Sequence, residues 1–282
     1  MTRAPWVLSK TSTPFGRDME LFDSSFGWRF VNPKMQGMYG TDAMGETAEN
    51  LADIYKILRE DQDLYAFRSQ MKAAEATSNG RLQKEILSLS IPRKKAEPIH
   101  FNQDEFIKAG TTLEKLSTLK PAFRKDGTVT AGNASGLNDG AAAMILASQT
   151  AVNENKLTPI ARIISSGVIG VEPHIMGIGP VGASQLALKR AGLTLDQMDV
   201  IELNEAFAAQ VLACTRNMGL EDEDPRINPN GGAIALGHPL GMSGTRLILT
   251  AALQLQIEKK KYALCTMCIG VGQGYAVVIE RV

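Results

Sequence analysis

Predicted strands and helices alternate from about Pro159 to the end of the 282-residue chain, and this rhythm constrains the fold more than any other feature of the sequence. Apolar runs typical of strands occur at residues 161–167, 200–203, 262–267 and 275–280. Amphipathic segments that predict helices occur at residues 183–191, after Asn204, and around 249–257, and Gly192 is suited to end the first of them. A chain with this order of elements is expected to form an α/β domain in which helices cover a sheet.

The first part of the chain is less regular. Residues 1–40 show no helical or strand period, so we expect an irregular arm there. Apolar helical faces predict two helices at residues 46–58 and 61–77, and a strand at 85–91 then leads into a polar excursion that ends near residue 120. The small and apolar residues that follow predict a strand, a helix and a buried strand at 143–146.

The charge and the cysteine content exclude several classes of function. Thirty lysines and arginines balance thirty aspartates and glutamates, so the chain has no net charge with which to attract a nucleic acid or an anionic membrane. The first ten residues lack the apolar core of a signal peptide, and no apolar stretch reaches a bilayer-spanning length. Three cysteines are too few for a disulfide framework, which indicates a reducing compartment. We therefore expect a cytoplasmic globular protein.

Three segments that follow strands or contain clustered glycines carry the groups most suited to chemistry, because α/β proteins build ligand sites at such places. They are residues 204–207, 231–241 and 268–274. Asn204 follows the apolar strand VIEL and precedes a helix, so it is either a helix N-cap or a ligand-binding amide. His238 lies between a glycine and a proline, where its imidazole either bridges the loop or transfers a proton and donates to an oxyanion.

The cysteines raise a second question, because Cys265 and Cys268 have the spacing of a redox dithiol or of half a zinc site. On a strand, however, these two side chains point to opposite faces, and no second Cys or His pair completes a metal shell. Cys265 is therefore predicted to lie in the core, as is Cys214 on an apolar helix stripe, and Cys268 is the candidate for chemistry. The sequence CIGVGQG predicts a tight hairpin rather than a nucleotide-binding loop, because a strand follows it.

Taken together, these motifs resemble those of the thiolase family. NEAF at 204–207, GGAIALGHPLGMSG at 231–244 and CIGVGQG at 268–274 occur in the family's order and with its spacing. NASGLNDGAA at 133–142 and MGIGP at 176–180 match as well, so the resemblance covers essentially the whole chain. The segment FGWRFVNPKM is most similar to the branch of the family that cleaves 3-oxoadipyl-CoA, also called beta-ketoadipyl-CoA, in aromatic catabolism.

The resemblance implies thiolytic cleavage of a 3-oxoacyl-CoA to acetyl-CoA and a shortened acyl-CoA. It implies a layered α-β-α-β-α fold with an incomplete N-terminal half and an inserted α+β loop domain. Residues 1–127 would form the loop domain, 128–155 a remnant of the N-terminal domain, and 156–282 the C-terminal domain. Coenzyme A would be a substrate, with no cofactor and no metal, and full-length relatives would be homo-oligomers.

The same resemblance implies roles for individual residues. His238 is similar to the histidine that activates the nucleophilic cysteine and, with a water held by Asn204, forms an oxyanion hole. Cys268 is similar to the acid or base that exchanges the α-proton of acetyl-CoA, and the N–H of Gly270 to a donor of a second oxyanion hole. The residues similar to the coenzyme A contacts of the family are Ser135 at the pantetheine arm, Met44, Phe123, Met176 and Phe207 as apolar walls, and Lys108 near the nucleotide.

One departure from the family concerns the nucleophile. A thiolase has it in a Cys-Gly-Ser-Gly context, which none of the three cysteines has. The first residues also resemble an internal segment of thiolase sequences, so we expect a truncated chain with impaired activity. A non-catalytic module that binds acyl-CoA is an alternative. A ketoacyl synthase is disfavoured, because such enzymes usually present two histidines or a histidine and an asparagine where this chain offers Cys268.

Overall fold

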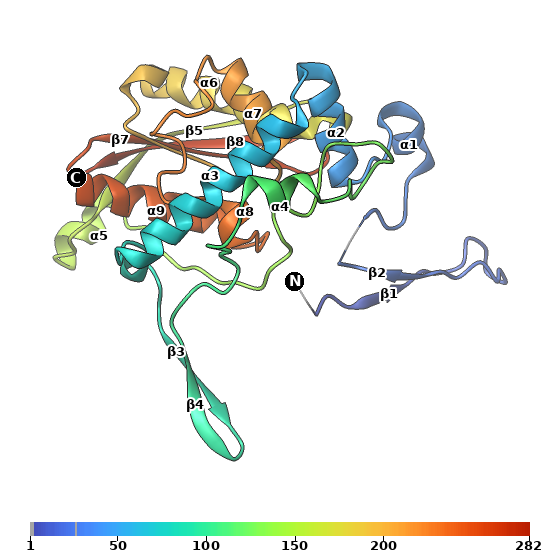
Figure 1. Ribbon diagram of the computed structural model, residues 1–282, viewed down its shortest axis with the longest axis horizontal. Helices are drawn as coiled ribbons and strands as arrows, with labels where there is room; N and C mark the ends of the chain where they lie inside the picture. Colours follow the sequence, from blue (N-terminus) through green and yellow to red (C-terminus); the bar gives the residue numbers. More distant parts are fainter. Residues whose placement is uncertain (1–2, 26) are drawn as a thin grey trace.

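The centre of the computed structural model, which describes residues 3–25 and 27–282, is a four-stranded mixed sheet (Figure 1). Its strands are β5 (Ala161–Gly170), β6 (Val200–Leu203), β7 (Tyr262–Ile269) and β8 (Gln273–Arg281), in the order β5-β8-β7-β6. β8 runs antiparallel to β5 and β7, whereas β6 runs parallel to β7 with Leu203 opposite Thr266. Because β6 and β7 are parallel, their carboxyl ends meet at one edge of the sheet.

Helices cover both faces of this sheet, as the alternating pattern predicted. On one face α9 (Ser243–Glu258) packs Leu247, Ala251 and Leu255 against apolar residues of the strands. On the other face α6 (Gly179–Ala191) packs Ala183 and Ala187 against the sheet. Gly192 ends α6 in the left-handed conformation, with φ 68°, as the sequence predicted.

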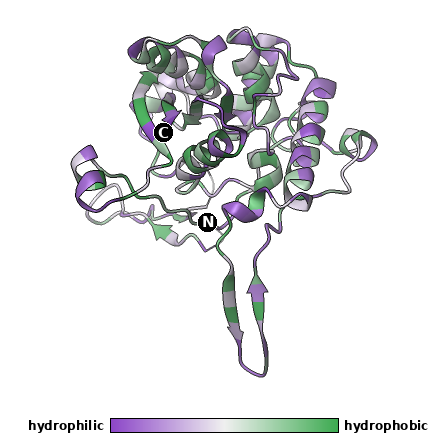
Figure 2. Ribbon diagram, turned by 90° about the vertical axis from the view of Figure 1, so that its left-hand side faces the viewer, coloured by the Kyte–Doolittle hydropathy of each residue, from purple (hydrophilic) through white to green (hydrophobic). Residues whose placement is uncertain are grey.

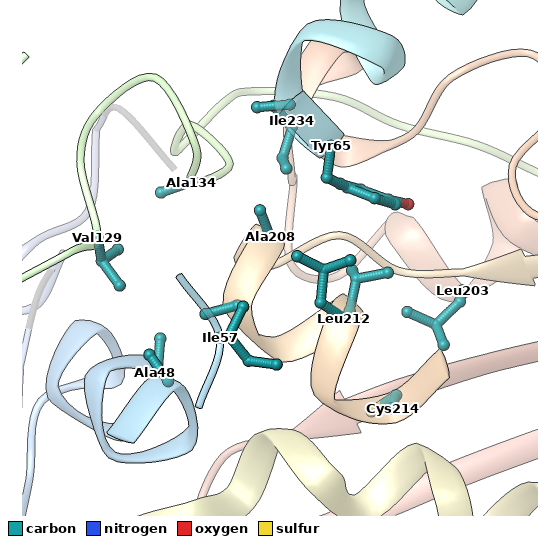
Figure 3. Packing of buried hydrophobic residues seen from close by; sticks show 14 of the residues in the cluster. Ala48, Ile57, Tyr65, Val129, Ala134, Leu203, Ala208, Leu212, Cys214 and Ile234 are labelled. Atoms are coloured by element: carbon teal, nitrogen blue, oxygen red, sulfur yellow. The ribbon is translucent and has the colours of Figure 1, made fainter. Parts of the chain in front are cut away.

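A second layer of helices packs on the outer side of α7 (Ala208–Asn217), as Figure 3 shows. α2 (Met44–Tyr55) and α3 (Arg59–Ser78) confirm the two helices predicted near residues 46–58 and 61–77. Buried alanines such as Ala48, Ala66 and Ala208 let these helices approach closely, and Tyr65 and Leu212 fill the space between them. This packing fixes the segments on either side of α7, which carry the candidate site.

One close approach ties the end of the sheet to α6. A Cβ atom at Gly274 on β8 would lie 2.1 Å from the carbonyl oxygen of Gly179, the first residue of α6. Since both partners are backbone, neither can move aside as a flexible side chain would. Glycine at this position therefore lets the β7–β8 hairpin lie directly against the start of α6.

The prediction for residues 128–148 is wrong. Apart from isolated bridges, which pair Thr130 with Pro121 and Ala134 with Phe207, this segment has no strand and no helix. Ile145 is 91% exposed and Leu146 70% exposed, where a buried strand was expected. The apolar segment at 143–146 can form a buried strand only beside a partner strand that supplies hydrogen bonds, and no described strand pairs with it.

Two small hairpins and a short helix lie outside this body. The arm contains β1 (Trp6–Leu8) paired with β2 (Leu21–Asp23) and α1 (Pro33–Tyr39), so it has more regular structure than predicted. Its expected irregularity at residues 1, 2 and 26 lies outside the described residues. β3 (Leu89–Arg93) confirms a strand in the predicted region, but its partner β4 (Ala96–Phe101) was not predicted, because both strands of this projecting hairpin are exposed along their whole length (Figure 2).

The remaining helices are short. They are α4 (Leu113–Ser117), α5 (Gln149–Glu154), α8 (Ala233–Leu236) and the 3-10 turns η1 (Leu82–Lys84), η2 (Pro173–Ile178) and η3 (Leu195–Gln197). Within the described residues no helix is long and apolar enough to cross a membrane.

Candidate active site

Asn204 stands at the carboxyl end of β6, where its backbone N–H donates to the Thr266 carbonyl of β7 at 3.0 Å. The side chain is fully buried, and its amide nitrogen lies 3.3 Å from Nε2 of His238. Helix α7 begins only at Ala208 with Phe207 as its N-cap, so Asn204 is not a helix cap. Its buried amide oxygen has no hydrogen-bond partner among the described residues, which leaves an acceptor for a ligand or a water.

The His238 loop is anchored by a segment far away in the sequence. The backbone N–H of His238 donates to the Gly136 carbonyl at 3.1 Å and to Oδ1 of Asn138 at 3.4 Å. Gly237 has φ 88°, and a Cβ there would lie 2.4 Å from the Asn138 side chain. The motif at 133–142 and the motif at 231–244 therefore meet at this histidine.

Cys268 lies near the end of β7, on the opposite side of the sheet from Cys265. Its neighbours are Met176, Ala206 and Phe207, whereas Cys265 packs under α9. The predicted separation of the two thiols is confirmed. Because Asn204 bonds to the backbone of Thr266, two residues before Cys268, the carboxamide and this thiol occupy the same edge of the sheet.

The other cysteine, Cys214, is fully buried in α7, and its thiol donates to the Gly177 carbonyl at 3.1 Å. The prediction of a buried structural thiol is confirmed. All three cysteines are free.

The turn after Cys268 is the predicted tight hairpin between β7 and β8. Val271 and Gly272 have φ values of 67° and 88°, and the hairpin brings Gly270 to the start of α2. A Cβ on Gly270 would lie 4.0 Å from Sδ of Met44. Met44, predicted as an apolar wall for the pantetheine arm, and Gly270, predicted as an oxyanion donor, are thus neighbours.

The other predicted apolar walls continue this surface. Phe123 and Phe207 meet edge to face, with ring centroids 5.9 Å apart at 85°. Phe123 also covers Gly45 next to Met44, since a Cβ on Gly45 would lie 2.1 Å from its ring. Phe207 in turn packs with Met176 beside Cys268. Met176, Phe207 and Phe123 therefore form a chain of contacts that begins at the thiol, and Met44 adjoins its far end through Gly45.

The two polar residues predicted to contact coenzyme A lie at different distances from this surface. The backbone N–H of Ser135 donates to the Ala206 carbonyl at 3.0 Å, which brings Ser135 beside the Asn204 segment. Lys108 is exposed, and its Nζ lies 5.3 Å from the centroid of the Phe106 ring. It is linked to the site through Phe106, since a Cβ on Gly136 would lie 2.5 Å from that ring.

Burial sets the protonation of the two titratable groups. Desolvation lowers the pKa of His238 to about 4, and the positive charge of Arg246 acts in the same direction. Desolvation raises the pKa of Cys268 to about 12. At neutral pH the site thus holds a neutral imidazole, which can accept a proton, and a neutral thiol, which can donate one.

Sequence reasoning missed Ser243, Arg246 and Glu202. Ser243 Oγ lies 2.6 Å from Nδ1 of His238, and it is the first residue of α9. Arg246, one turn further on, lies 3.6 Å from the fully buried carboxylate of Glu202 on β6, and burial raises the pKa of Glu202 to about 8. The sequence signal for this buried ion pair was Glu202, a single acidic residue inside the otherwise apolar strand VIEL.

Comparison with known proteins agrees with this geometry. The family described as "Thiolase, N-terminal domain" matches residues 17–150, and "Thiolase, C-terminal domain" matches residues 157–281. The chain is 57% identical over 282 residues to a beta-ketoadipyl-CoA thiolase of Acinetobacter baylyi and 55% identical to a 3-oxoadipyl-CoA/3-oxo-5,6-dehydrosuberyl-CoA thiolase of Escherichia coli. In both cases the match covers 100% of this chain and 70% of the relative.

A solved structure of a thiolase has the same fold. Human mitochondrial 3-ketoacyl-CoA thiolase superposes with a TM-score of 0.90 at 44% identity, over 100% of this chain and 69% of that one. The fold and the site therefore define an α/β acyltransferase. The chain belongs to the thiolase family, and the predicted α/β thiolase fold is confirmed.

Proposed function

We propose that this chain binds the thioester end of an acyl-CoA at the sheet edge formed by Asn204, His238 and Cys268, and that its reaction is the thiolytic cleavage of 3-oxoadipyl-CoA. The observation that carries the proposal is the 3.3 Å contact between the Asn204 amide and the His238 ring, at the edge of the sheet where β7 also bears Cys268. The names of the two bacterial relatives support the choice of substrate.

The chemistry of cleavage suits these groups. When the bond breaks, the departing acetyl-CoA carries negative charge on its thioester oxygen and α-carbon. In a thiolase the thiol of the nucleophilic cysteine gives its proton to Nε2 of the histidine matched by His238, and its sulfur bonds to the 3-oxo carbon. It holds the shortened acyl group as a thioester until coenzyme A takes that group and returns a proton to the cysteine. The Nε2–H gained by His238 can donate to the thioester oxygen of the departing acetyl-CoA, together with a water on Asn204. Cys268 returns the proton to the α-carbon, and the Gly270 N–H stabilises the second oxyanion.

The residues on the surface that leads to this edge support coenzyme A as the carrier of the acyl group. The apolar chain of Met44, Phe123, Met176 and Phe207 matches the thin, largely apolar pantetheine arm. Ser135 is a polar neighbour for that arm, and the exposed ammonium of Lys108 is a partner for the phosphates. No cofactor and no metal takes part in this proposal.

We further propose the division into a loop domain at residues 1–127, a remnant of the N-terminal domain at 128–155 and a C-terminal domain at 156–282. Action in the cytoplasm and a homo-oligomeric state of full-length relatives belong to the same proposal.

Turnover by the 282 residues alone is proposed to be impaired. Cys214, Cys265 and Cys268 are buried, and each has a pKa raised by burial, so none supplies a reactive thiolate at neutral pH. Without a nucleophile to receive the acyl group, cleavage has no covalent intermediate. A chain that binds acyl-CoA without turnover is the second candidate function, and the cysteine inventory favours it.

Binding and turnover can be measured separately on the purified chain. Calorimetry with acetyl-CoA is expected to detect binding, and Met44→Glu should weaken it at least about tenfold, because a carboxylate then replaces an apolar wall of the pantetheine arm. Met38→Glu on α1 is the matched control, since Met38 is also an exposed methionine and should leave affinity unchanged. Thiolysis of 3-oxoadipyl-CoA should be slower than that of a full-length relative by on the order of 10³-fold or more.

The outcomes separate the two parts of the proposal. Absence of binding, or equal weakening by both methionine variants, contradicts the site. Thiolysis near the rate of a full-length relative contradicts the impairment and leaves the site intact.

A further inference from the structure

Both ring nitrogens of His238 have partners, and a serine outside the proposed catalytic set is one of them. Nδ1 lies 2.6 Å from Oγ of Ser243, and that Oγ lies 3.1 Å from the Pro239 carbonyl. Nε2 lies 3.3 Å from the amide nitrogen of Asn204. Because a neutral imidazole carries one proton, these three contacts discriminate between its two tautomers.

With the proton on Nδ1, all three contacts are hydrogen bonds. The Ser243 hydroxyl donates to the Pro239 carbonyl, its lone pair accepts Nδ1–H, and the bare Nε2 accepts from the Asn204 amide. With the proton on Nε2, the hydroxyl must turn to Nδ1, and Nε2–H faces an N–H donor. The Asn204 amide would have to flip so that its oxygen accepts from Nε2–H, and its buried NH₂ group would then lose Nε2 as its acceptor. Three bonds against two favour the first arrangement.

Ser243 is held where it can enforce this choice. It is 1% exposed and is the first residue of α9, whose later turns pack into the core through Leu247 and Ala251. The Pro239 carbonyl also accepts the backbone N–H groups of Met242 and Ser243. The loop that carries His238 and the helix that carries the hydroxyl are thus one rigid unit.

We propose that Ser243 is a positioning residue that holds His238 as the Nδ1–H tautomer and so presents an unprotonated Nε2 to the site. The consequence rests on the proposed function. The thiol of the nucleophilic cysteine of a complete thiolase gives its proton to Nε2 and becomes a thiolate, while Nδ1–H stays bonded to Ser243. The new Nε2–H is then a donor for the thioester oxygen. In the other tautomer Nε2 would already carry a proton and could not accept one.

The tautomer can be read directly from the free protein. In two-dimensional ¹⁵N–¹H spectra of histidine-labelled protein, the ring nitrogen without a proton resonates far downfield of the protonated one, and couplings to the ring C–H groups tell them apart. The chain has three histidines, and loss of one signal set in His238→Asn assigns the resonances. We expect a wide split for His238 at neutral pH with the proton on Nδ1, and averaged signals for the exposed His100 and His174.

Variants then test the part played by Ser243. Ser243→Ala should lose most of the split, because no acceptor remains for Nδ1–H, and Ser243→Thr should keep it, because the hydroxyl is retained. Ser184→Ala is the matched control, since Ser184 is equally buried and its Oγ has no described partner. It should leave the His238 signals unchanged.

Three results would overturn the proposal. They are an Nε2–H tautomer in the parent chain, an unchanged split in Ser243→Ala, and the same loss in Ser184→Ala. If Ser243→Ala does not fold, the parent spectrum decides alone. Because no substrate is present, failure of acyl-CoA binding or of thiolysis would count against the proposed function and not against this tautomer.

Discussion

Replacing His238 by alanine should lower acyl transfer by on the order of 10³-fold or more in a chain that also carries the Cys-Gly-Ser-Gly nucleophile of thiolases. The substitution removes a proton acceptor and an oxyanion donor in one step. Asn204, whose amide nitrogen lies 3.3 Å from the ring, would keep its own place through the backbone bond to Thr266. The measurement is the initial rate of 3-oxoadipyl-CoA thiolysis at saturating coenzyme A.

His100→Ala is the control for this substitution, because that histidine is exposed on β4 and should be dispensable. The pH profile adds a second check. A base whose pKa is lowered to about 4 is unprotonated above that pH, so the histidine-dependent loss of rate should begin only as pH falls toward 4, below the ordinary value of 6.5. An active His238→Ala enzyme would remove the residue from the mechanism.

Replacing Cys268 by alanine should lower the exchange of the α-protons of acetyl-CoA with solvent by about 10²-fold or more in the same nucleophile-bearing chain. The thiol lies at the sheet edge with the Asn204 segment, and burial raises its pKa to about 12. Its thiolate is a strong enough base to remove an α-proton, and the thiol so formed returns a solvent-exchanged proton to the carbanion. Deuterium uptake by acetyl-CoA, followed by mass spectrometry, measures the exchange.

Cys265→Ala is a closely matched control, since it removes the same group three residues earlier on the same strand. Cys265 packs under α9, away from the site, so its loss should cost about 1 kcal/mol of stability and leave exchange unchanged. Equal loss of exchange in the two variants would show that burial of a thiol, rather than its place at the edge, decides the rate.

Most of the central fold could be predicted because its signals are local. The apolar segment VIEL forms strand β6 over its whole length, and Gly192 ends α6 as expected. Local signals failed where structure depends on distant partners. Ile145 and Leu146 have the composition of a buried strand but are exposed, because a strand needs a neighbour to bond with. β4 pairs only with β3 and has no buried face to produce an alternating pattern.

The site divides in the same way. Strand period alone separated Cys265 from Cys268, because alternate residues face opposite layers. The contact of Asn204 with His238 joins residues 34 apart, and the bond from His238 to Asn138 spans 100, so no local pattern announces either. The contact of Ser243 with His238 could not be predicted, because a serine at the start of a helix commonly bonds to nearby backbone groups instead.

The structure of the 282-residue chain with acetyl-CoA bound would test the central claim most directly. We predict that the thioester oxygen lies within hydrogen-bond distance of Nε2 of His238, with the α-carbon facing the Cys268 thiol and the pantetheine arm passing between Met44 and Phe207. An acetyl group seated anywhere else, with His238, Asn204 and Cys268 left without contact to it, would contradict the account.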